Sequence, residues 1–181
     1  MLRRTALALI ALAGLSFVVP QAIPQADAEE ASGEKVSNFT LRDINNQEVS
    51  LDDFENQVVL FSFWATWCAP CMVELPHVQR IYDTYKDQGF VVLAISADDA
   101  RSASKVKPMV KSKGWTFPVL LDKQTKVVSE RNPGKTLPYT ELLDHTHSVI
   151  YKHQGYNAGD EVHLEDKVKA AVAARKAALG E

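Results

Sequence analysis

Residues 58–63 form a nearly continuous apolar stretch, VVLFSF, and this stretch limits the possible folds more than any other feature of the chain. Its length is that of a β-strand, and a strand without polar alternation is typical of a sheet that is covered on both faces. Residues 90–95, FVVLAI, repeat the pattern after one helix-length of chain. Helices must cover both faces of such a sheet, so the two stretches predict an α/β fold.

The remaining segments alternate between strand and helix patterns. Alternation on both sides of a turn at residues 45–47 predicts an N-terminal β-hairpin, and Asp160 is expected to cap a final helix with one apolar stripe. No internal repeat or long linker divides the chain, so residues 38–181 are expected to form one domain around a mixed sheet. Further helices are expected near residues 78–88, 106–113 and 126–130, and further strands near 119–121, 139–143 and 149–151.

The first thirty residues have the pattern of an export signal. Arg3 and Arg4 precede an apolar run at residues 5–19, and Ala26–Asp27–Ala28 supplies the small-x-small pattern that a signal peptidase reads. The run is shorter than the ~20 residues that a helix needs to cross a bilayer comfortably. We therefore expect residues 1–28 to be a cleaved signal peptide, followed by a flexible lead at 29–37. The alternative is an uncleaved anchor, which would bring the protein into contact with the membrane.

Composition is that of an ordinary soluble domain, with 24% charged and 46% hydrophobic residues and a formal net charge of −3. No basic stripe indicates a nucleic-acid partner. An exported protein enters an oxidising compartment, the periplasm or another extracytoplasmic space, where cysteines form disulfides.

The only two cysteines of the chain, Cys68 and Cys71, directly follow the first apolar stretch. A bridge across two intervening residues removes little entropy from the unfolded chain, so the pair is a poor structural staple. A strand-to-helix transition there would place Cys68 at a helix N-terminus, where N–H groups and the helix dipole stabilise a thiolate. Thiol pKa values in such motifs fall from ~8.5 to ~7 or lower, about 2 kcal/mol in favour of the charged form. The pattern predicts an accessible attacking thiol at Cys68 and a resolving thiol one turn later at Cys71.

Two other roles stay open for the cysteine pair. It could be an inert local disulfide, or half of a zinc or copper site, although no second cysteine pair supplies further ligands. His145, His147 and His153 could meet a metal across the terminal hairpin, but histidines in an exposed turn are more often solvated. We expect no metal, and no cofactor beyond the redox-active cysteine pair.

The sequence around the pair resembles the TlpA/ResA-like branch of the thioredoxin superfamily. The resemblance is carried by residues 63–71 (FWATWCAPC) and 74–76 (ELP), with support from 38–43, 49–54 and 95–98. It implies a thioredoxin fold, a mixed central sheet flanked by helices, with an N-terminal hairpin and a central helical insertion. The activity it implies is thiol–disulfide exchange outside the cytoplasm, usually as a reductase of exported proteins fed by a membrane electron donor of the DsbD or CcdA kind.

The resemblance also assigns roles to residues near the pair. Pro138 falls at the superfamily's cis-proline loop, so Leu137 before it would contribute its backbone to substrate recognition, and Tyr139 stands where the branch often has Thr. Glu74 matches an acidic position of the branch and could shuttle the proton of the buried thiol; the alternative is a solvated glutamate of the first helical turn. Thioredoxin keeps a buried Asp at the position of Ser62, a departure that shifts a proton-relay role toward Glu74. Trp67 would shield the thiol and offer a flat contact surface.

Three functions compete at this point. The leading one is reduction of disulfides in exported proteins, either generally or on apocytochrome cysteines during cytochrome c maturation. A thiol peroxidase is the second, but the Pro-x-x-x-Thr-x-x-Cys pattern that peroxiredoxins resemble is not matched by Thr66 and Cys68. A copper chaperone is the third, and its usual Cys-x-x-x-Cys is one residue wider than the pair here.

Overall fold

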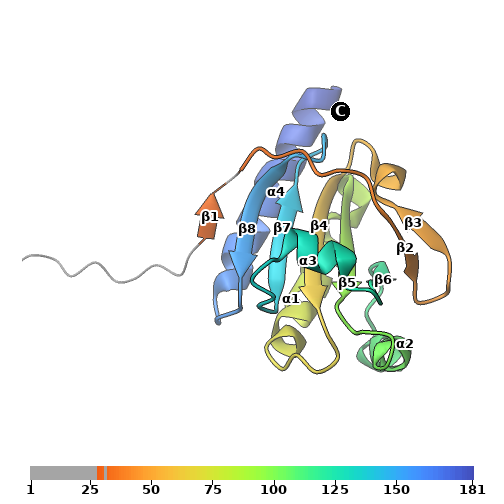
Figure 1. Cartoon of the computed structure of the whole chain (residues 1–181). Helices are drawn as coiled ribbons and strands as arrows, with labels where there is room; N and C mark the ends of the chain where they lie inside the picture. The colour runs from red at the N-terminus through yellow and green to blue at the C-terminus, as the bar shows by residue number, and fades with distance from the viewer. Residues whose placement is uncertain (1–27, 31) are drawn as a thin grey trace, which may run out of the picture.

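The computed structural model describes residues 28–30 and 32–181. In this part of the chain, eight strands form one sheet in the order β1-β8-β7-β4-β5-β6-β2-β3 (Figure 1). Its centre is β4 (Val58–Trp64), with β5 (Phe90–Ser96) parallel on one side and β7 (Tyr139–Leu143) antiparallel on the other. Every residue of β4 and β5 is buried, which confirms the prediction of a sheet covered on both faces.

Alternate residues of β4 face two separate cores. Val58, Leu60 and Trp64 pack in the core that lies beneath α1 (Cys71–Tyr85), α2 (Val106–Lys113) and α4 (Asp160–Leu179). Val59, Phe61 and Phe63 pack in the other core with α3 (Lys126–Arg131), which crosses the opposite face of the sheet (Figure 1). The period of two along β4 therefore places α1, the helix that begins at Cys71, on one side of the sheet together with α2 and α4.

The edges of the sheet come from the predicted hairpins. On one side, β6 (Val119–Leu121) runs parallel to β5 and is followed by β2 (Thr40–Asp43) and β3 (Glu48–Ser50), the N-terminal hairpin. On the other side, β8 (Val149–Gln154) forms a hairpin with β7. The helix α2 lies between β5 and β6 in sequence, at the place of the predicted central insertion.

The lead at residues 29–37 is not loose along its whole length, and that prediction was wrong. Residues Ala28–Glu30 form β1, which pairs antiparallel with β8, and Lys35 bridges Ser148. Next to that bridge, the Val36 N–H donates to the carbonyl of His147 at 2.9 Å, and Val36 is buried. Backbone bonds to the β8 hairpin therefore order a polar segment that has no apolar periodicity of its own. The expected signal peptide lies, apart from its last residue, outside the described residues and stays a prediction.

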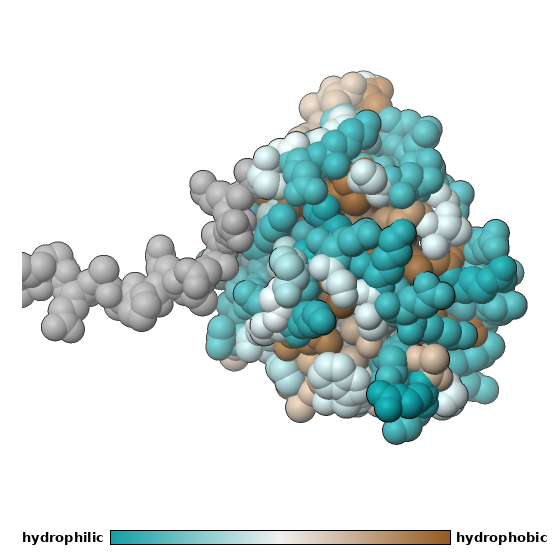
Figure 2. Space-filling model, in the orientation of Figure 1, coloured by the Kyte–Doolittle hydropathy of each residue, from teal (hydrophilic) through white to brown (hydrophobic). Residues whose placement is uncertain are grey.

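The last helix confirms its predicted apolar stripe but begins differently. Leu164, Val168, Ala171 and Val172 are all buried against the sheet. Gly159 is the N-cap residue, and the carboxylate of Asp160 accepts instead from the Asn157 N–H at 2.7 Å. None of the helices in the described ranges is long and apolar enough to cross a membrane. In the view of Figure 2 the surface is mostly hydrophilic, with apolar residues in small scattered patches.

Candidate active site

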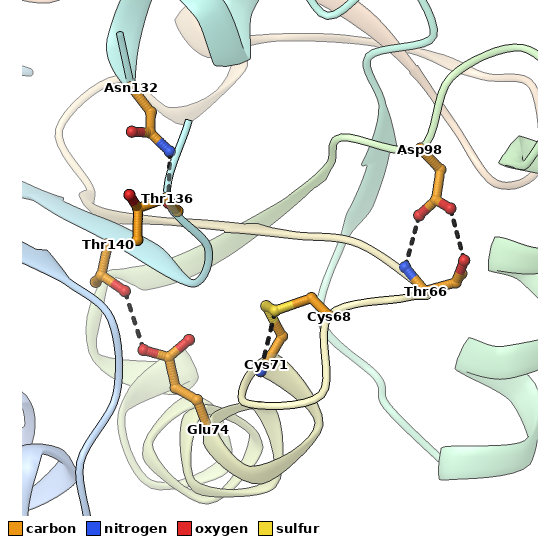
Figure 3. The surroundings of a disulfide bond; sticks show 8 residues. All are labelled: Thr66, Cys68, Cys71, Glu74, Asp98, Asn132, Thr136 and Thr140. Atoms are coloured by element: carbon orange, nitrogen blue, oxygen red, sulfur yellow. Dashed lines mark hydrogen bonds between the residues drawn. A yellow bond between two sulfur atoms is a disulfide. The ribbon is translucent and has the colours of Figure 1, made fainter. Parts of the chain in front are cut away.

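The cysteine pair lies at the junction between the central strand and its following helix. Chain from the end of β4 turns through residues 65–70 and enters α1 at Cys71, and Cys68 and Cys71 form a disulfide with a Cα–Cα distance of 5.3 Å (Figure 3). The backbone N–H of Cys71 donates to Sγ of Cys68 at 3.2 Å. This is the helix N-terminal donor that the sequence predicts for a thiolate at position 68.

The exposed fractions of the two cysteines differ in the predicted order, but Cys68 is less exposed than expected. Cys71 is fully buried and Cys68 is 4% exposed, so the prediction of an openly accessible thiol was wrong for this oxidised form. The reason is local, because the Cys68 sulfur is tied to a buried partner while its neighbours Trp67, Ala69 and Pro70 are exposed. Trp67, next to Cys68 in the chain, is 67% exposed. Cys68 therefore lies just beneath the surface.

A buried aspartate that sequence reasoning did not single out anchors the loop before Cys68. Asp98 is fully buried just beyond β5, and its carboxylate accepts from the backbone N–H of Thr66 at 2.8 Å and from the Thr66 hydroxyl at 2.6 Å (Figure 3). The Ser96 hydroxyl adds a third bond at 2.9 Å. The sequence indicates residues 95–98 only as part of a family resemblance, and nothing local in it connects Asp98 with Thr66.

The loop that faces the pair is built as the sequence predicts. The Leu137–Pro138 peptide bond is cis, which confirms the prediction for Pro138. Buried Asn132 holds this loop by donating its Nδ2 to the carbonyl of Thr136 at 2.7 Å (Figure 3). Leu137 is half-buried and packs against both cores. The backbone beside Pro138 is thus fixed across from the disulfide (Figure 3).

Glu74 is the charged residue of α1 next to the disulfide, and it is buried rather than solvated. It is 4% exposed, one helical turn after Cys71, and its Oε1 accepts from the Thr140 hydroxyl at 3.2 Å (Figure 3). Burial raises the pKa of Glu74 to about 7; the bond from Thr140 lowers it and the charge of Asp160 raises it further. Oε2 has no hydrogen-bond partner within the described part of the chain. A carboxyl group with this pKa can gain or lose a proton near neutral pH.

Two of the three histidines of the terminal hairpin do not lie in solvent as expected, whereas His145 is partly exposed. His147 and His153 are each 7% exposed; Nε2 of His147 bonds to the carbonyl of Phe54 at 3.1 Å, and Nε2 of His153 bonds to Asp160 at 2.9 Å. His147 is enclosed by a segment distant in the sequence, and His153 by the start of α4, seven residues later; a strand pattern alone shows neither contact. Within residues 28–30 and 32–181, no group of three or more His, Cys, Asp or Glu could hold a metal ion.

Comparison of the chain with known proteins identifies its family. The profile of the AhpC/TSA family matches residues 32–152. The chain belongs to the AhpC/TSA family. Two relatives are named thiol-disulfide oxidoreductase ResA: a Bacillus cereus protein is 33% identical over 84% of this chain and 86% of its own length, and the Geobacillus kaustophilus protein is 33% identical over 78% and 79%.

Solved structures support the same assignment of this AhpC/TSA-family chain. A crystal structure from Chlorobium tepidum, described as a thiol:disulfide interchange protein DsbE, aligns with a TM-score of 0.70 and 26% identity over 82% of this chain and 99% of that one. A thioredoxin-like protein from Porphyromonas gingivalis aligns with a TM-score of 0.64 and 32% identity, covering 74% and 89% of the two chains. The fold is the thioredoxin fold, the chain is ResA-like, and it is a thiol–disulfide oxidoreductase with the Cys68–Cys71 pair.

Proposed function

We propose that this oxidoreductase reduces disulfides in exported proteins, with Cys68 as the attacking thiol and Cys71 as the resolving thiol. The observation that carries the assignment is the bond from the Cys71 N–H to Sγ of Cys68 at the start of α1. A donor aimed at that sulfur stabilises it as a thiolate, and only Cys68 of the two has any exposed surface. Cys71 is fully buried one turn later and is placed to attack the mixed disulfide at Cys68.

The reaction proceeds through two exchanges. The Cys68 thiolate attacks one sulfur of a substrate disulfide, forms a mixed disulfide and releases the other substrate sulfur as a thiolate. Cys71 then loses its proton and attacks the Cys68 sulfur, which re-forms the Cys68–Cys71 bond and releases the second substrate thiolate. Two electrons pass from the dithiol to the substrate, and the two released thiolates take up protons. No cofactor is required for these steps.

Glu74 is the group proposed to accept the proton of Cys71 in the second exchange. Residues that are three apart lie next to one another on the same side of a helix, so Glu74 adjoins Cys71 on α1. Both residues are buried, and a thiol sealed from water needs an internal base. A carboxylate whose pKa is about 7 is matched to that task at neutral pH.

Substrate recognition is proposed for the surface around Cys68. The cis bond at Pro138 leaves the backbone of Leu137 beside the pair, where an extended peptide could add to it as a strand. The exposed indole of Trp67 supplies a flat apolar contact on the other side of the loop. Trp67, Leu137 and Pro138 would therefore hold the substrate, whereas Cys68, Cys71 and Glu74 carry the chemistry.

The cellular setting extends this proposal. The apolar run at residues 5–19 supports export to the periplasm or an equivalent space, with tethering to the inner membrane if the run is retained. A reductase in an oxidising space needs electrons from the cytoplasm, so a membrane donor of the DsbD or CcdA type would re-reduce the pair. Apocytochrome cysteines, during cytochrome c maturation, are one candidate class of substrate.

Trapping tests the roles of the two cysteines. In Cys71→Ala the mixed disulfide cannot be resolved, so exported substrates should accumulate on Cys68 and be identified by mass spectrometry. The matched control is Cys68→Ala, and equal trapping by that variant would reverse the assignment. A reduction potential of about −120 mV, in the range of a strong oxidant, would overturn the proposal that the protein acts as a reductase. Peroxide consumption, or tight copper binding without insulin reduction, would instead support the peroxidase or the copper chaperone.

A further inference from the structure

A row of polar side chains crosses the sheet beneath Glu74. Ser62 of β4 lies opposite Thr140 of β7, and Thr140 lies opposite His153 of β8. Directly opposed residues of neighbouring strands point to the same face, with Cβ atoms about 5 Å apart. This face is the one that α1 and α4 cover, and all three side chains are buried there. Polar groups in such a place are normally satisfied, so the row needs an explanation.

The far end of the row reaches the surface through Asp160. Nε2 of His153 lies 2.9 Å from Oδ2 of Asp160, the first residue of α4. The His153 side chain is 8% exposed and that of Asp160 is 21% exposed, so this hydrogen-bonded pair spans the boundary between interior and solvent. Nδ1 of His153 is buried and has no hydrogen-bond partner in the described ranges.

A small cavity joins this pair to Glu74. Its volume open to a water molecule is about 10 Å³, which is the space of a single water. Glu74, Thr140, His153 and Asp160 line it together, so one water there would have the polar partners that a buried water requires. The titratable groups around it come from every neighbouring element: Glu74 and His77 from α1, Tyr151 and His153 from β8, Tyr156 from the following loop, and Asp160 and Glu161 from α4.

Most of those other groups are already engaged. The Tyr156 hydroxyl donates to Glu161 at 2.8 Å, the His77 ring stacks on Tyr156, and the Tyr151 ring stacks on His153. Burial raises the pKa values of Tyr151 and Tyr156 to about 12, so neither phenol releases a proton near neutral pH. Of the groups that line the cavity, His153 and Asp160 form the hydrogen-bonded pair that leads from it toward solvent.

We infer that His153 and Asp160 are positioning residues of the active site, which pass protons between Glu74 and solvent through a water molecule in this cavity. The inference rests on the proposed role of Glu74 in accepting the proton of Cys71. Protonated Glu74 donates to the water, the water donates to Nδ1 of His153, and Nε2 of His153 releases its proton to Asp160 and from there to solvent. Glu74 returns to the carboxylate, no electron moves, and rotation of the water and exchange of the histidine tautomer reset the path.

The test is a double-mutant cycle. The resolving step is followed by stopped-flow tryptophan fluorescence after mixing the reduced protein with a peptide disulfide, between pH 5.5 and 8.5. His153→Gln removes the relay, and we expect the step to slow by about tenfold or more. In a Glu74→Gln background, which already lacks the proton acceptor, adding His153→Gln should change the rate less than about twofold, because both residues act on one path.

A matched control and a milder variant keep the test decisive. His147→Gln alters another buried histidine of the same hairpin, outside the cavity, and should leave the rate unchanged in both backgrounds. Asp160→Asn, at a partly exposed site, should fold even if His153→Gln does not, and should slow the step and shift its pH midpoint downward. Losses of equal size in both Glu74 backgrounds, or no loss, would overturn the relay. Insulin reduction by the wild type is read separately, so its absence would count against the proposed function instead.

Discussion

Glu74→Gln should change how the stability of this protein depends on pH. The structure places the Glu74 carboxyl in the interior with one hydrogen bond, from Thr140, and burial raises its pKa from the ordinary 4.5 to about 7. In the unfolded chain the same group ionises near its ordinary value. Glutamine has nearly the same shape and carries no charge at any pH, so the substitution removes this titration and little else.

The direction in which stability changes with pH follows from the linkage between proton binding and folding. A carboxyl group with a raised pKa favours folding fully below pH 4.5, and the advantage is lost as pH rises through about 7, because the folded protein then has to hold a buried charge. The difference between pKa values of 4.5 and about 7 corresponds to about 3 kcal/mol. Relative to Glu74→Gln, the wild type should therefore lose about 3 kcal/mol of unfolding free energy between pH 4 and pH 8.

Urea denaturation of the oxidised forms, at steps from pH 4 to pH 8, measures this difference. The disulfide is intact throughout, so neither cysteine titrates. Subtracting the two proteins at each pH cancels the other ionisable groups, and for a domain of this size the change equals roughly 6–12 °C in Tm. A difference that is flat with pH, or that is complete by pH 5, would show that Glu74 ionises as an exposed glutamate and would refute the reasoning.

Further substitutions probe the contacts around the site. Thr140→Val removes the bond that lowers the pKa of Glu74, so that pKa should rise above about 7 in a carboxyl-carbon NMR titration. Asp98→Asn disturbs the anchor of Thr66 and should cost about 1–3 kcal/mol in urea unfolding, with slower insulin reduction. Arg131→Met leaves the fully buried Glu141 with the Tyr139 hydroxyl and, as its cation, Lys152 at 3.6 Å; it should cost about 3 kcal/mol at pH 7, and an unchanged urea midpoint would contradict it.

Sequence patterns predicted the parts of the fold that local residues decide. The apolar stretches at 58–63 and 90–95 form the central parallel pair of strands. They could be predicted because strands that are buried on both faces consist almost entirely of apolar residues, a pattern that the sequence shows directly. The cysteine spacing was also a local signal, whereas the cis bond at Pro138 was implied by the family resemblance. The prediction of a flexible segment at 29–37 failed because this segment is ordered by backbone hydrogen bonds to the β8 hairpin, which lies more than a hundred residues later in the chain.

The site residues that the sequence left open or missed have the same cause. From the sequence, Glu74 could equally be a solvated glutamate of the first helical turn; in the structure β7 and α4 bury it. His153 likewise has the pattern of a turn histidine, but the start of α4 places Asp160 against it. Asp98 is separated by 32 positions from the Thr66 that it holds. In each case burial depends on how another element of the fold packs against the residue, and the sequence alone does not show which polar residue will be enclosed.

The strand β7 explains how one element serves both the chemistry and the substrate surface. Its first residue follows the cis bond at Pro138, Thr140 reaches Glu74 on the α1 face, and Glu141 on the other face accepts two bonds from Arg131 of α3 at 2.8 and 3.1 Å. Polar contacts thus hold β7 from both sides, directly after the loop that faces the disulfide. Because the same strand fixes the backbone beside Pro138 and tunes Glu74, loosening it at Thr140 should alter the proton step, whereas loosening it at Glu141 should alter peptide affinity as well as stability.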